Sequence, residues 1–285
     1  MTVQVITDST SYLNEQTQKD LNIQVISLSV TFGEDSIKET DLTNDTFYEM
    51  MKQRGIPISS QPAIGELMQL MLSIVEKGDP LLGVFLSSEM SGTYTTACMA
   101  RDKILEKYPN AQIEIIDSKS NCMQLGFAAI TAAKAAQAGK TLAEVKLATE
   151  NNLKRSRFIF IPDNLEYLKK GGRIGGASAL LGNFLQIIPI LTVEKGAVVV
   201  LNKVRTKKNA INTIVEKMLQ DIKEFGLGEV GVHHINCFDE AQALAQRLEN
   251  ELKQAINIWD IGPVIGLHVG PGALGLAYYT EKDLR

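Results

Sequence analysis

Short apolar stretches rich in Val and Ile alternate with helical patterns through the first half of the chain. The strand-like stretches mostly end in serine, threonine or aspartate (Val3–Ser9, Ile23–Phe32, Leu81–Ser88 and Ile113–Ser118). Helical patterns follow or separate them (Thr43–Arg54, Ile64–Lys77, Thr93–Tyr108 and Gln124–Ala138). Strand and helix in repetition predict a parallel sheet with right-handed crossovers, and the continuous apolar character predicts strands that are buried on both faces.

The second half follows a different pattern. Pro189–Arg205 reads as a β-hairpin that turns at Glu194, Lys195 and Gly196. Further strands and amphipathic helices follow the start of this half (strands Arg157–Pro162 and Glu229–Ile235, helices Asn209–Phe225 and Glu240–Gln254, and two strands in the last forty residues). These patterns predict a parallel-sheet α/β domain over residues 1–155 and an α+β domain with a mixed or antiparallel sheet over 156–285.

Composition excludes several classes of protein. The 285 residues include 45% apolar and 22% charged residues, which is typical of a soluble protein with a substantial core. The net charge of -4 argues against nucleic acid as a partner. There is no run of 18 apolar residues, and the first residues already read as a strand, so we expect no stable membrane insertion and no signal peptide. Three dispersed cysteines (Cys98, Cys122 and Cys237) are typical of reduced thiols in the cytoplasm.

Candidate chemistry begins at the carboxyl ends of the predicted strands, where open parallel sheets bind their ligands. Ser91 and Gly92 precede the helix predicted from Thr93, and a helix start offers free N–H groups to an anion. Plain N-capping by Ser91 is the alternative. The clusters Asp8–Ser11 and Asp117–Ser118 favour turns and caps.

Two further segments carry polar candidates. Ser59 and Ser60 stand before Pro62 and a predicted helix, where they would either cap the helix or bind a ligand. His268 lies between strand-like residues and a glycine turn, in a segment whose glycines permit positive φ and close backbone approach (Gly266, Gly270, Gly272 and Gly275). A backbone carbonyl could instead satisfy His268, and we expect this for His233 and His234. The spacing around His268 gives no metal site.

The distribution of charged residues restricts the class of ligand that such a site could bind. Ser59–Gly65, Leu86–Ala100 and Gly262–Ala277 contain no Lys or Arg, so a site built from them offers hydroxyls, N–H groups and one imidazole. Such a set can hold a carboxylate by hydrogen bonds but is poor for a polyphosphate. Gly171–Gly176 follows a helix-like stretch and reads as a C-cap and turn. The apolar Ala177–Leu191 reads as a buried helix and strand, or as the wall of an apolar pocket.

Five ordered motifs resemble one family. The motifs are ITDST at the start, SSQP, SSEMSGTY, EYLKKGGRI and GPVIGLHVGPGALG near the end. Together they resemble the DegV family of bacterial fatty-acid-binding proteins, the FakB-type subunits of fatty acid kinase, over essentially the whole chain. Ser59 stands where the family often has threonine, and Met90 where it often has leucine.

The resemblance implies a function and a set of residues. It implies two α/β domains with one long-chain fatty acid between them, the carboxylate near the junction and the acyl chain in an apolar tunnel. It implies no catalysis by this chain alone, since an ATP-dependent kinase subunit would form the acyl phosphate used for phospholipid synthesis. The family's ligand-binding positions fall on Ser59 or Ser60, on Ser91 with Gly92, and on His268. Arg173 falls on a position implicated in docking the kinase, and no metal or other cofactor is implied.

A different class of function remains as the alternative. Ser91 as nucleophile and His268 as base would make a stand-alone hydrolase or transferase acting on a small carboxylate or acyl ester. That reading needs a third group that orients His268, and the local sequence offers no acidic residue. A DNA-binding regulator is disfavoured by the low basic charge.

Overall fold

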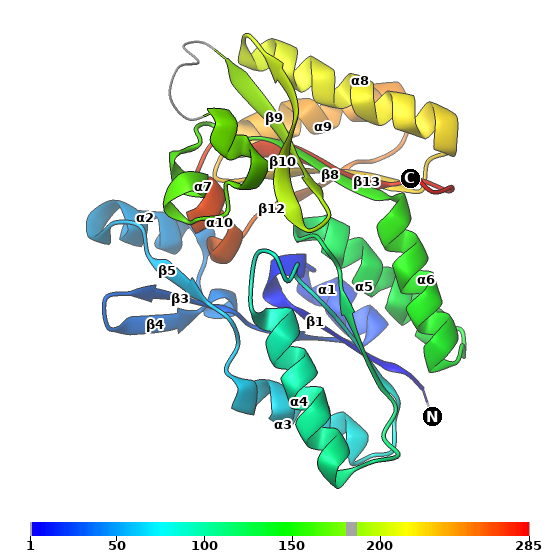
Figure 1. Cartoon of the computed structure of the whole chain (residues 1–285). Coiled ribbons are helices and arrows are strands. Elements are labelled where there is room, and N and C mark those ends of the chain that lie inside the picture. The colour runs from blue at the N-terminus through cyan, green and yellow to red at the C-terminus, as the bar shows by residue number, and fades with distance from the viewer. Residues whose placement is uncertain (1, 181–186, 285) are drawn as a thin grey trace.

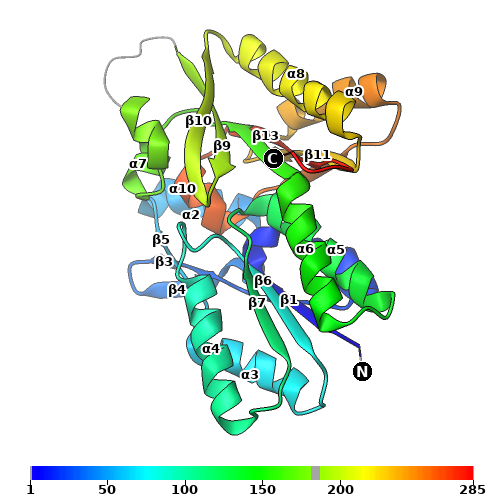
Figure 2. The same cartoon turned by 45° about the vertical axis from the view of Figure 1, so that its right-hand side comes forward.

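Three sheets organise the part of the chain that the structure, a computed structural model, describes, namely residues 2–180 and 187–284 (Figure 1). A four-stranded parallel sheet has the order β2-β1-β6-β7, a six-stranded sheet the order β10-β9-β8-β13-β11-β12, and a small antiparallel sheet the order β4-β3-β5. The two larger sheets lie one above the other, with helices between them and outside them (Figure 2). This arrangement confirms the predicted fold class.

The parallel sheet carries helices on both faces. Its strands are β1 (Gln4–Asp8), β2 (Ile23–Ile26), β6 (Leu81–Phe85) and β7 (Ile113–Asp117). Successive side chains point to opposite faces, so Ile6 packs with the apolar cluster of α3 and α4, whereas Val5 packs on the side of α5. The helices are α3 (Ile64–Val75) and α4 (Thr93–Lys107) on the outer face, and α1 (Glu15–Leu21), α5 (Cys122–Gln137) and α6 (Leu142–Arg155) on the other.

Helix α5 lies between the two large sheets. It contacts β1 and β6 on one side and β8 and β13 on the other. Its sequence suits this position, because small side chains allow both sheets to approach the helix closely, and its alanines are buried (Ala128, Ala129, Ala132, Ala133, Ala135 and Ala136). The strands, helices and connecting loops of both halves therefore share one continuous apolar cluster.

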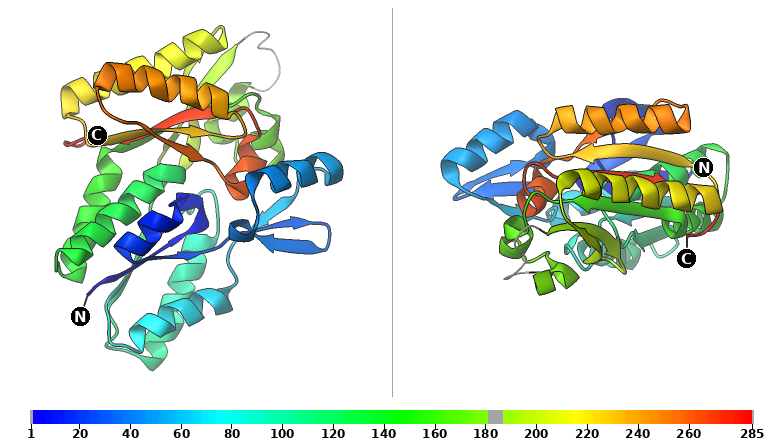
Figure 3. Two further views of the ribbon diagram at one scale, coloured as in Figure 1. Left: turned by 180° about the vertical axis from the view of Figure 1, so that it is seen from behind. Right: turned by 90° about the horizontal axis from the view of Figure 1, so that it is seen from above.

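The six-stranded sheet has α8 (Lys207–Phe225) and α9 (Phe238–Leu252) on its outer face (Figure 3). Its strands are antiparallel except for the β11–β12 pair. The strands are β8 (Ser156–Ile161), β9 (Ile188–Glu194), β10 (Ala197–Val204), β11 (Glu229–His234), β12 (Asn257–Asp260) and β13 (Leu274–Tyr279). Lys195 and Gly196 both have positive φ and connect paired Glu194 and Ala197, so the predicted hairpin turn is confirmed.

The small sheet, the 3₁₀ turns η1 (Ser9–Ser11) and η2 (Glu39–Asp41), and three further short helices complete the fold. The sheet consists of β3 (Ser29–Phe32), β4 (Asp35–Lys38) and β5 (Ile58–Ser60), and α2 (Asn44–Arg54) connects β4 to β5. The short helices are α7 (Glu166–Lys170), α10 (Pro263–Val269) and the 3₁₀ helix η3 (Gly175–Leu180). Helix α10 contacts α7, β3 and β5, so it lies where the small sheet meets the C-terminal half.

Several sequence predictions about local structure are wrong. Ile23–Phe32 forms two strands in two sheets, because the chain leaves the parallel sheet at Ser27, whose hydroxyl bonds to Leu28 O. The small sheet and the helices α1 and α6 were not predicted. The helix expected within Ala177–Leu191 falls partly outside the described residues, since 181–186 are not described; residues 177–180 belong to η3 and 188–191 to β9.

The division at residues 155 and 156 stays a prediction. Helix α6 ends at Arg155 and β8 begins at Ser156, but the apolar cluster of α5 extends across both halves. Within residues 2–180 and 187–284, no helix is both long and apolar enough to span a bilayer.

Candidate functional site

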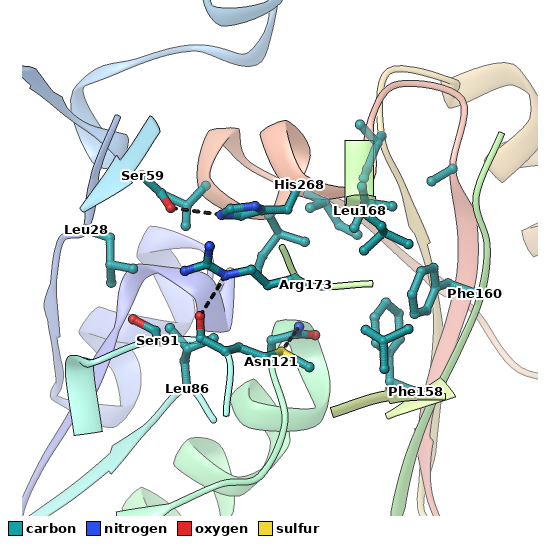
Figure 4. A pocket seen from close by; sticks show the side chains of 18 of the residues that line it. Leu28, Ser59, Leu86, Ser91, Asn121, Phe158, Phe160, Leu168, Arg173 and His268 are labelled. Carbon is teal, nitrogen blue, oxygen red and sulfur yellow. Dashed lines mark hydrogen bonds between the residues drawn. The ribbon is translucent and has the colours of Figure 1, made fainter. Parts of the chain in front are cut away.

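One cavity collects the predicted site residues from distant segments. It encloses about 330 Å³ at the carboxyl end of β6, between the parallel sheet, the small sheet and the six-stranded sheet (Figure 4). All of the predicted ligand-binding residues line it, together with the predicted docking residue (Ser59, Ser60, Ser91, Gly92, His268 and Arg173). This location agrees with the rule that ligands bind beyond the carboxyl ends of parallel strands.

Ser59 and His268 form the central polar contact of the cavity. The hydroxyl Oγ of Ser59 lies 2.8 Å from Nε2 of His268. Ser59 lies on β5, where it pairs with Val30 of β3, and Pro62 and Ala63 separate it from helix α3. The prediction of a helix cap at Ser59 and Ser60 is therefore wrong, because the helix begins four residues after Ser60.

His268 lies in the last turn of α10 rather than beside a strand. Pro263 occupies the first turn, and Gly270, with a φ of 87°, ends the helix by donating its N–H to Gly266 O. The local prediction failed because a short apolar segment with two glycines resembles a strand. The predicted close approaches are present: a Cβ at Gly266 would lie 2.5 Å from the Tyr48 hydroxyl, and one at Gly275 would lie 2.7 Å from Ile159 O.

The imidazole of His268 is neutral at physiological pH. Burial, with a further contribution from the Arg173 charge, lowers the pKa of His268 to about 4. Its Nδ1 atom is buried and has no hydrogen-bond partner among the described residues. Gly171 packs against this edge of the ring, since a Cβ there would lie 2.2 Å from Nδ1.

Ser91 lies across the cavity from Ser59 on the loop after β6 (Figure 4). Its Oγ lies 2.9 Å from Thr93 Oγ1 and accepts a hydrogen bond from Thr93 N at 3.3 Å. Ser91 therefore satisfies the helix N–H foreseen for a cap, although the N-cap residue of α4 is Gly92. A Cβ at Gly92 would lie 1.9 Å from Oε1 of Gln61, so glycine there lets Gln61 reach the loop.

Arg173 brings a positive charge to the cavity. This charge was not expected from the sequence, because Arg173 lies outside the three segments with polar candidates, which contain no Lys or Arg. Its Nε donates to Met90 O at 3.1 Å and its Nη1 donates to Gly171 O at 2.5 Å. The guanidinium extends between His268 and Ser91 (Figure 4). Among the described residues, no carboxylate forms an ion pair with it. Gly171 and Gly172 end α7 as predicted, and this turn places Arg173 at the cavity.

Other polar residues line the cavity that the sequence did not single out. Asn121, which precedes α5, donates to Met90 Sδ at 3.2 Å, and Gln61 donates to Thr96 Oγ1 at 2.6 Å. His233 Nε2 accepts a hydrogen bond from Met123 N at 3.1 Å. Burial lowers the pKa of His233 to about 3, against a smaller opposing effect of a backbone hydrogen bond with Trp259, and the carbonyl partner expected for this histidine stays a prediction. Only the motif SSQP signalled Gln61 beforehand.

Apolar side chains form the rest of the wall. Phe158 and Phe160 stack on the inner face of β8 with ring centroids 5.2 Å apart, on the side of the cavity away from Ser59 and Ser91 (Figure 4). Further apolar residues line the cavity, and Leu28 and Leu86 among them lie near Ser59 and Ser91 (Leu28, Leu86, Met90, Leu168, Val198, Ile235, Ile261, Val264, Ile265 and Leu274). The cavity therefore has a polar side and an apolar side, which suits an amphipathic carboxylate.

The predicted clusters at two other strand ends have structural roles. Asp8 is fully buried and accepts hydrogen bonds from Leu86 N at 2.7 Å and Thr10 N at 3.0 Å, which ties the end of β1 to β6. Asp117 pairs with Lys119 at 2.8 Å. All three cysteines are free thiols, and no group of three potential metal-ligating side chains occurs within residues 2–180 and 187–284.

The chain is similar to known proteins over its whole length. Residues 2–281 match the model of a family described as "Uncharacterised protein, DegV family". A DegV domain-containing protein of Clostridium acetobutylicum is 60% identical over all 285 residues, which is 100% of both chains. The crystal structure of DegV from Bacillus subtilis, described as a fatty acid binding protein, is 32% identical, with a TM-score of 0.87 over 98% of this chain and 99% of that one.

Proposed function

This chain belongs to the DegV family, and we propose that it binds one long-chain fatty acid and presents its carboxylate to a kinase partner. The carboxylate lies at the polar side of the cavity, and the acyl chain lies along the apolar side. The description of the Bacillus subtilis relative as a fatty acid binding protein supports this ligand class. The observation that carries the proposal is the single cavity in which the Ser59–His268 pair and Ser91 face stacked phenylalanines.

The head group is bound by hydroxyls whose hydrogens are free to turn toward it. His268 is neutral, and its Nε2–H donates to Ser59 Oγ in the tautomer that leaves the Ser59 hydroxyl hydrogen for the ligand. Ser91 supplies a second hydroxyl from the opposite side. Hydrogen bonds to an ionised carboxylate are stronger than neutral ones, at about 1.5–3 kcal/mol each. His268 thus orients Ser59 rather than serving as the main ligand contact.

The acyl chain supplies most of the affinity. Each methylene that the wall removes from water contributes about 0.8 kcal/mol. Phe158 and Phe160 are almost fully buried and line the far side of the cavity with aromatic carbon. A small carboxylate without a hydrocarbon chain would leave this wall unused, which favours a lipid over a short acid.

The geometry disfavours a stand-alone hydrolase. A Ser–His–acid arrangement needs the histidine to contact the nucleophile on one side and a carboxylate on the other. His268 contacts Ser59 instead of Ser91, and its Nδ1 has no acceptor among the described residues. The chain accordingly binds and orients, and it does not catalyse alone.

The kinase partner would complete the reaction at the mouth of the cavity. A carboxylate oxygen attacks the γ-phosphorus of ATP, the bond to the β-phosphate oxygen breaks, and the acyl phosphate and ADP form. Arg173 is exposed beside the head-group side of the cavity, which suits a residue that contacts a partner there. The proposal includes a cytoplasmic location for this step and use of the acyl phosphate in phospholipid synthesis.

Extraction of the bound molecule tests the ligand. The protein is purified from a bacterial host and denatured, and the organic extract is analysed by mass spectrometry. We expect fatty acid at close to one molecule per chain, and palmitate or oleate should rebind to delipidated protein. An extract without fatty acid, together with failure to rebind either lipid, would overturn the proposal. A second experiment adds ATP and a fatty acid kinase catalytic subunit to the loaded protein. Acyl phosphate that forms only with this subunit supports presentation of the lipid to a kinase. If no acyl phosphate forms, the kinase part of the proposal fails.

A further inference from the structure

The start of helix α10 is capped by side chains from the other end of the chain. Pro263 has no N–H, and the next two N–H groups lack intrahelical partners. Val264 N donates to Glu39 Oε1 at 2.8 Å, and Ile265 N donates to the Tyr12 hydroxyl at 3.2 Å. Gly266 N then makes the first intrahelical bond, to Gly262 O at 2.8 Å. Two residues from the N-terminal half thus satisfy every free donor at this helix start.

Glu39 is held firmly behind this helix start. It is 5% exposed, and its two oxygens accept hydrogen bonds from three side-chain and backbone donors. Tyr12 OH donates to Oε1 at 3.1 Å, and Ser9 Oγ donates to Oε2. Ser9 Oγ in turn accepts from Leu28 N at 3.1 Å, next to β3. Glu39 is therefore held by hydrogen bonds to residues next to β1 and β3.

Because its start is held in place, helix α10 also holds His268 in place at the cavity. The helix has seven residues, with the Glu39 contact at its second residue and His268 at its sixth. Little more than one turn separates the two, so a shift of the helix start moves the imidazole by a similar amount. The Ser59–His268 contact is 2.8 Å, and a displacement of about 1 Å would break it.

We propose that Glu39 is a positioning residue of the fatty-acid site, which holds His268 against Ser59 by capping the helix that carries it. This inference rests on the proposed function, because it concerns the same head-group contact. Glu39 is not among the residues that line the cavity. It acts through α10, and Tyr12 acts with it at the adjacent N–H. The groups that face Glu39 are Asp8, Tyr12 and Cys122.

Three substitutions test this role at increasing severity. Tyr12→Phe removes the acceptor for Ile265 N, and Glu39→Gln keeps an oxygen for Val264 N. Glu39→Ala removes the acceptor for Val264 N and the hydrogen-bond partner of the Tyr12 hydroxyl. The matched control is Asp221→Asn. Asp221 is also a buried carboxylate, paired with Lys217 at 2.8 Å and bonded by Tyr278 at 2.7 Å, but it lies outside the cavity.

Two readouts separate positioning from mere stability. Palmitate affinity of the delipidated variants is measured well below the melting temperature, and the His268 pKa is measured by NMR titration without ligand. We expect Glu39→Ala to weaken palmitate binding about tenfold or more and to raise the His268 pKa from about 4 toward its ordinary value of 6.5, since water reaches the ring. Glu39→Gln and Tyr12→Phe should give smaller shifts in both. Asp221→Asn should lower only the melting temperature.

The outcomes distinguish this inference from the proposed function. Unchanged palmitate affinity and an unchanged His268 pKa in folded Glu39→Ala would overturn the positioning role. If Glu39→Ala fails to fold, the same two readouts on Glu39→Gln and Tyr12→Phe decide. If the wild-type protein binds neither palmitate nor oleate, the proposed function fails, and the ligand-free His268 titration still decides whether Glu39 positions the ring.

Discussion

Ser59 and His268 are 209 positions apart in the chain, and their side chains meet at 2.8 Å in the wall of one cavity. The strand β5 brings the serine and the helix α10 brings the histidine, so the contact forms only when the small sheet meets the C-terminal half. Neither side chain needs a charge for this contact. In the proposed function, the neutral pair leaves the Ser59 hydroxyl hydrogen for the carboxylate of the lipid.

The neighbouring serines provide the first prediction. Ser59→Ala should weaken palmitate binding by about 1.5–3 kcal/mol, because it removes a hydrogen bond to a charged carboxylate. Ser60→Ala is the matched control, since Ser60 is the adjacent and more exposed residue of β5. Calorimetric titration of both delipidated variants measures the difference. Equal losses in the two variants would contradict the assignment of the head group to Ser59.

Ser91 combines a local role with the proposed ligand role. Ser91→Ala should reduce fatty-acid affinity by about 1.5–3 kcal/mol through the lost carboxylate contact. It should also lower the unfolding free energy by about 1 kcal/mol, because Thr93 N loses its acceptor. Lipid content by mass spectrometry and chemical denaturation measure the two effects separately. Unchanged lipid content with lower stability would reduce Ser91 to a helix cap.

Two adjacent glycines at the end of α7 give a steric test. Gly171→Ala would place a Cβ 2.2 Å from His268 Nδ1, which forces the imidazole away from Ser59 and should weaken palmitate binding about tenfold. Gly172→Ala is the control: its φ of 69° strains alanine by about 1 kcal/mol, but no atom lies within 4 Å of the added Cβ. Only Gly171→Ala should change affinity. A loss of affinity confined to Gly172→Ala would show that backbone strain, and not the imidazole, matters.

The strands of the parallel sheet and the β9–β10 hairpin could be predicted because their signals are local. Val and Ile runs and the Lys195–Gly196 turn need no distant partner. Helix α10 could not be predicted in this way. Its seven residues include a glycine, and Glu39 and Tyr12 stabilise its start from more than 220 positions away. Glu39 could not be predicted as a site residue either, because its partner in α10 is distant in the sequence and nothing near it points to a ligand site.

The residues of the cavity were identified in large part by hydroxyls and glycines in ordered motifs, but their pairing was not. Sequence linked His268 with Ser91 as a conceivable base and nucleophile, whereas the fold pairs it with Ser59. Arg173 was assigned to a partner surface, yet it also lines the cavity. Which polar groups meet is decided by the contact of the small sheet with α10, and no periodicity encodes that contact.

Titration of His268 should destabilise the fold in acid. Its pKa is about 4 in the folded chain and near 6.5 when unfolded, so the unfolded state binds more protons between these values. The contribution of His268 to the unfolding free energy is therefore lost as pH falls from about 6.5 to 4. Asp8 and Glu39, whose pKa values burial raises to about 6 and about 7, act in the opposite direction.

The contribution of His268 to the pH dependence is obtained by comparing wild type with a variant that lacks this histidine. Denaturation of wild type and of His268→Gln is measured at each pH, and the difference between the two free energies is plotted. Asp8 and Glu39 are present in both proteins and cancel. We expect the difference to shrink toward pH 4, and a difference that stays constant across the window would show that His268 titrates with the same pKa in both states.

Substitution of Arg173 tests lipid binding and transfer to the kinase separately. Two of its nitrogens already donate to Met90 O and Gly171 O, and its side chain is exposed, so its charge adds little to a solvent-screened carboxylate. Arg173→Ala should therefore retain palmitate at near wild-type affinity but slow acyl-phosphate formation about tenfold when the kinase subunit and ATP are added. Lys170→Ala is the control, since it removes an exposed positive charge from the end of α7, three residues before Arg173 and outside the cavity. Equal kinase rates in Arg173→Ala and Lys170→Ala would remove Arg173 from the docking surface, whereas weakened palmitate binding would assign its guanidinium to the head group instead.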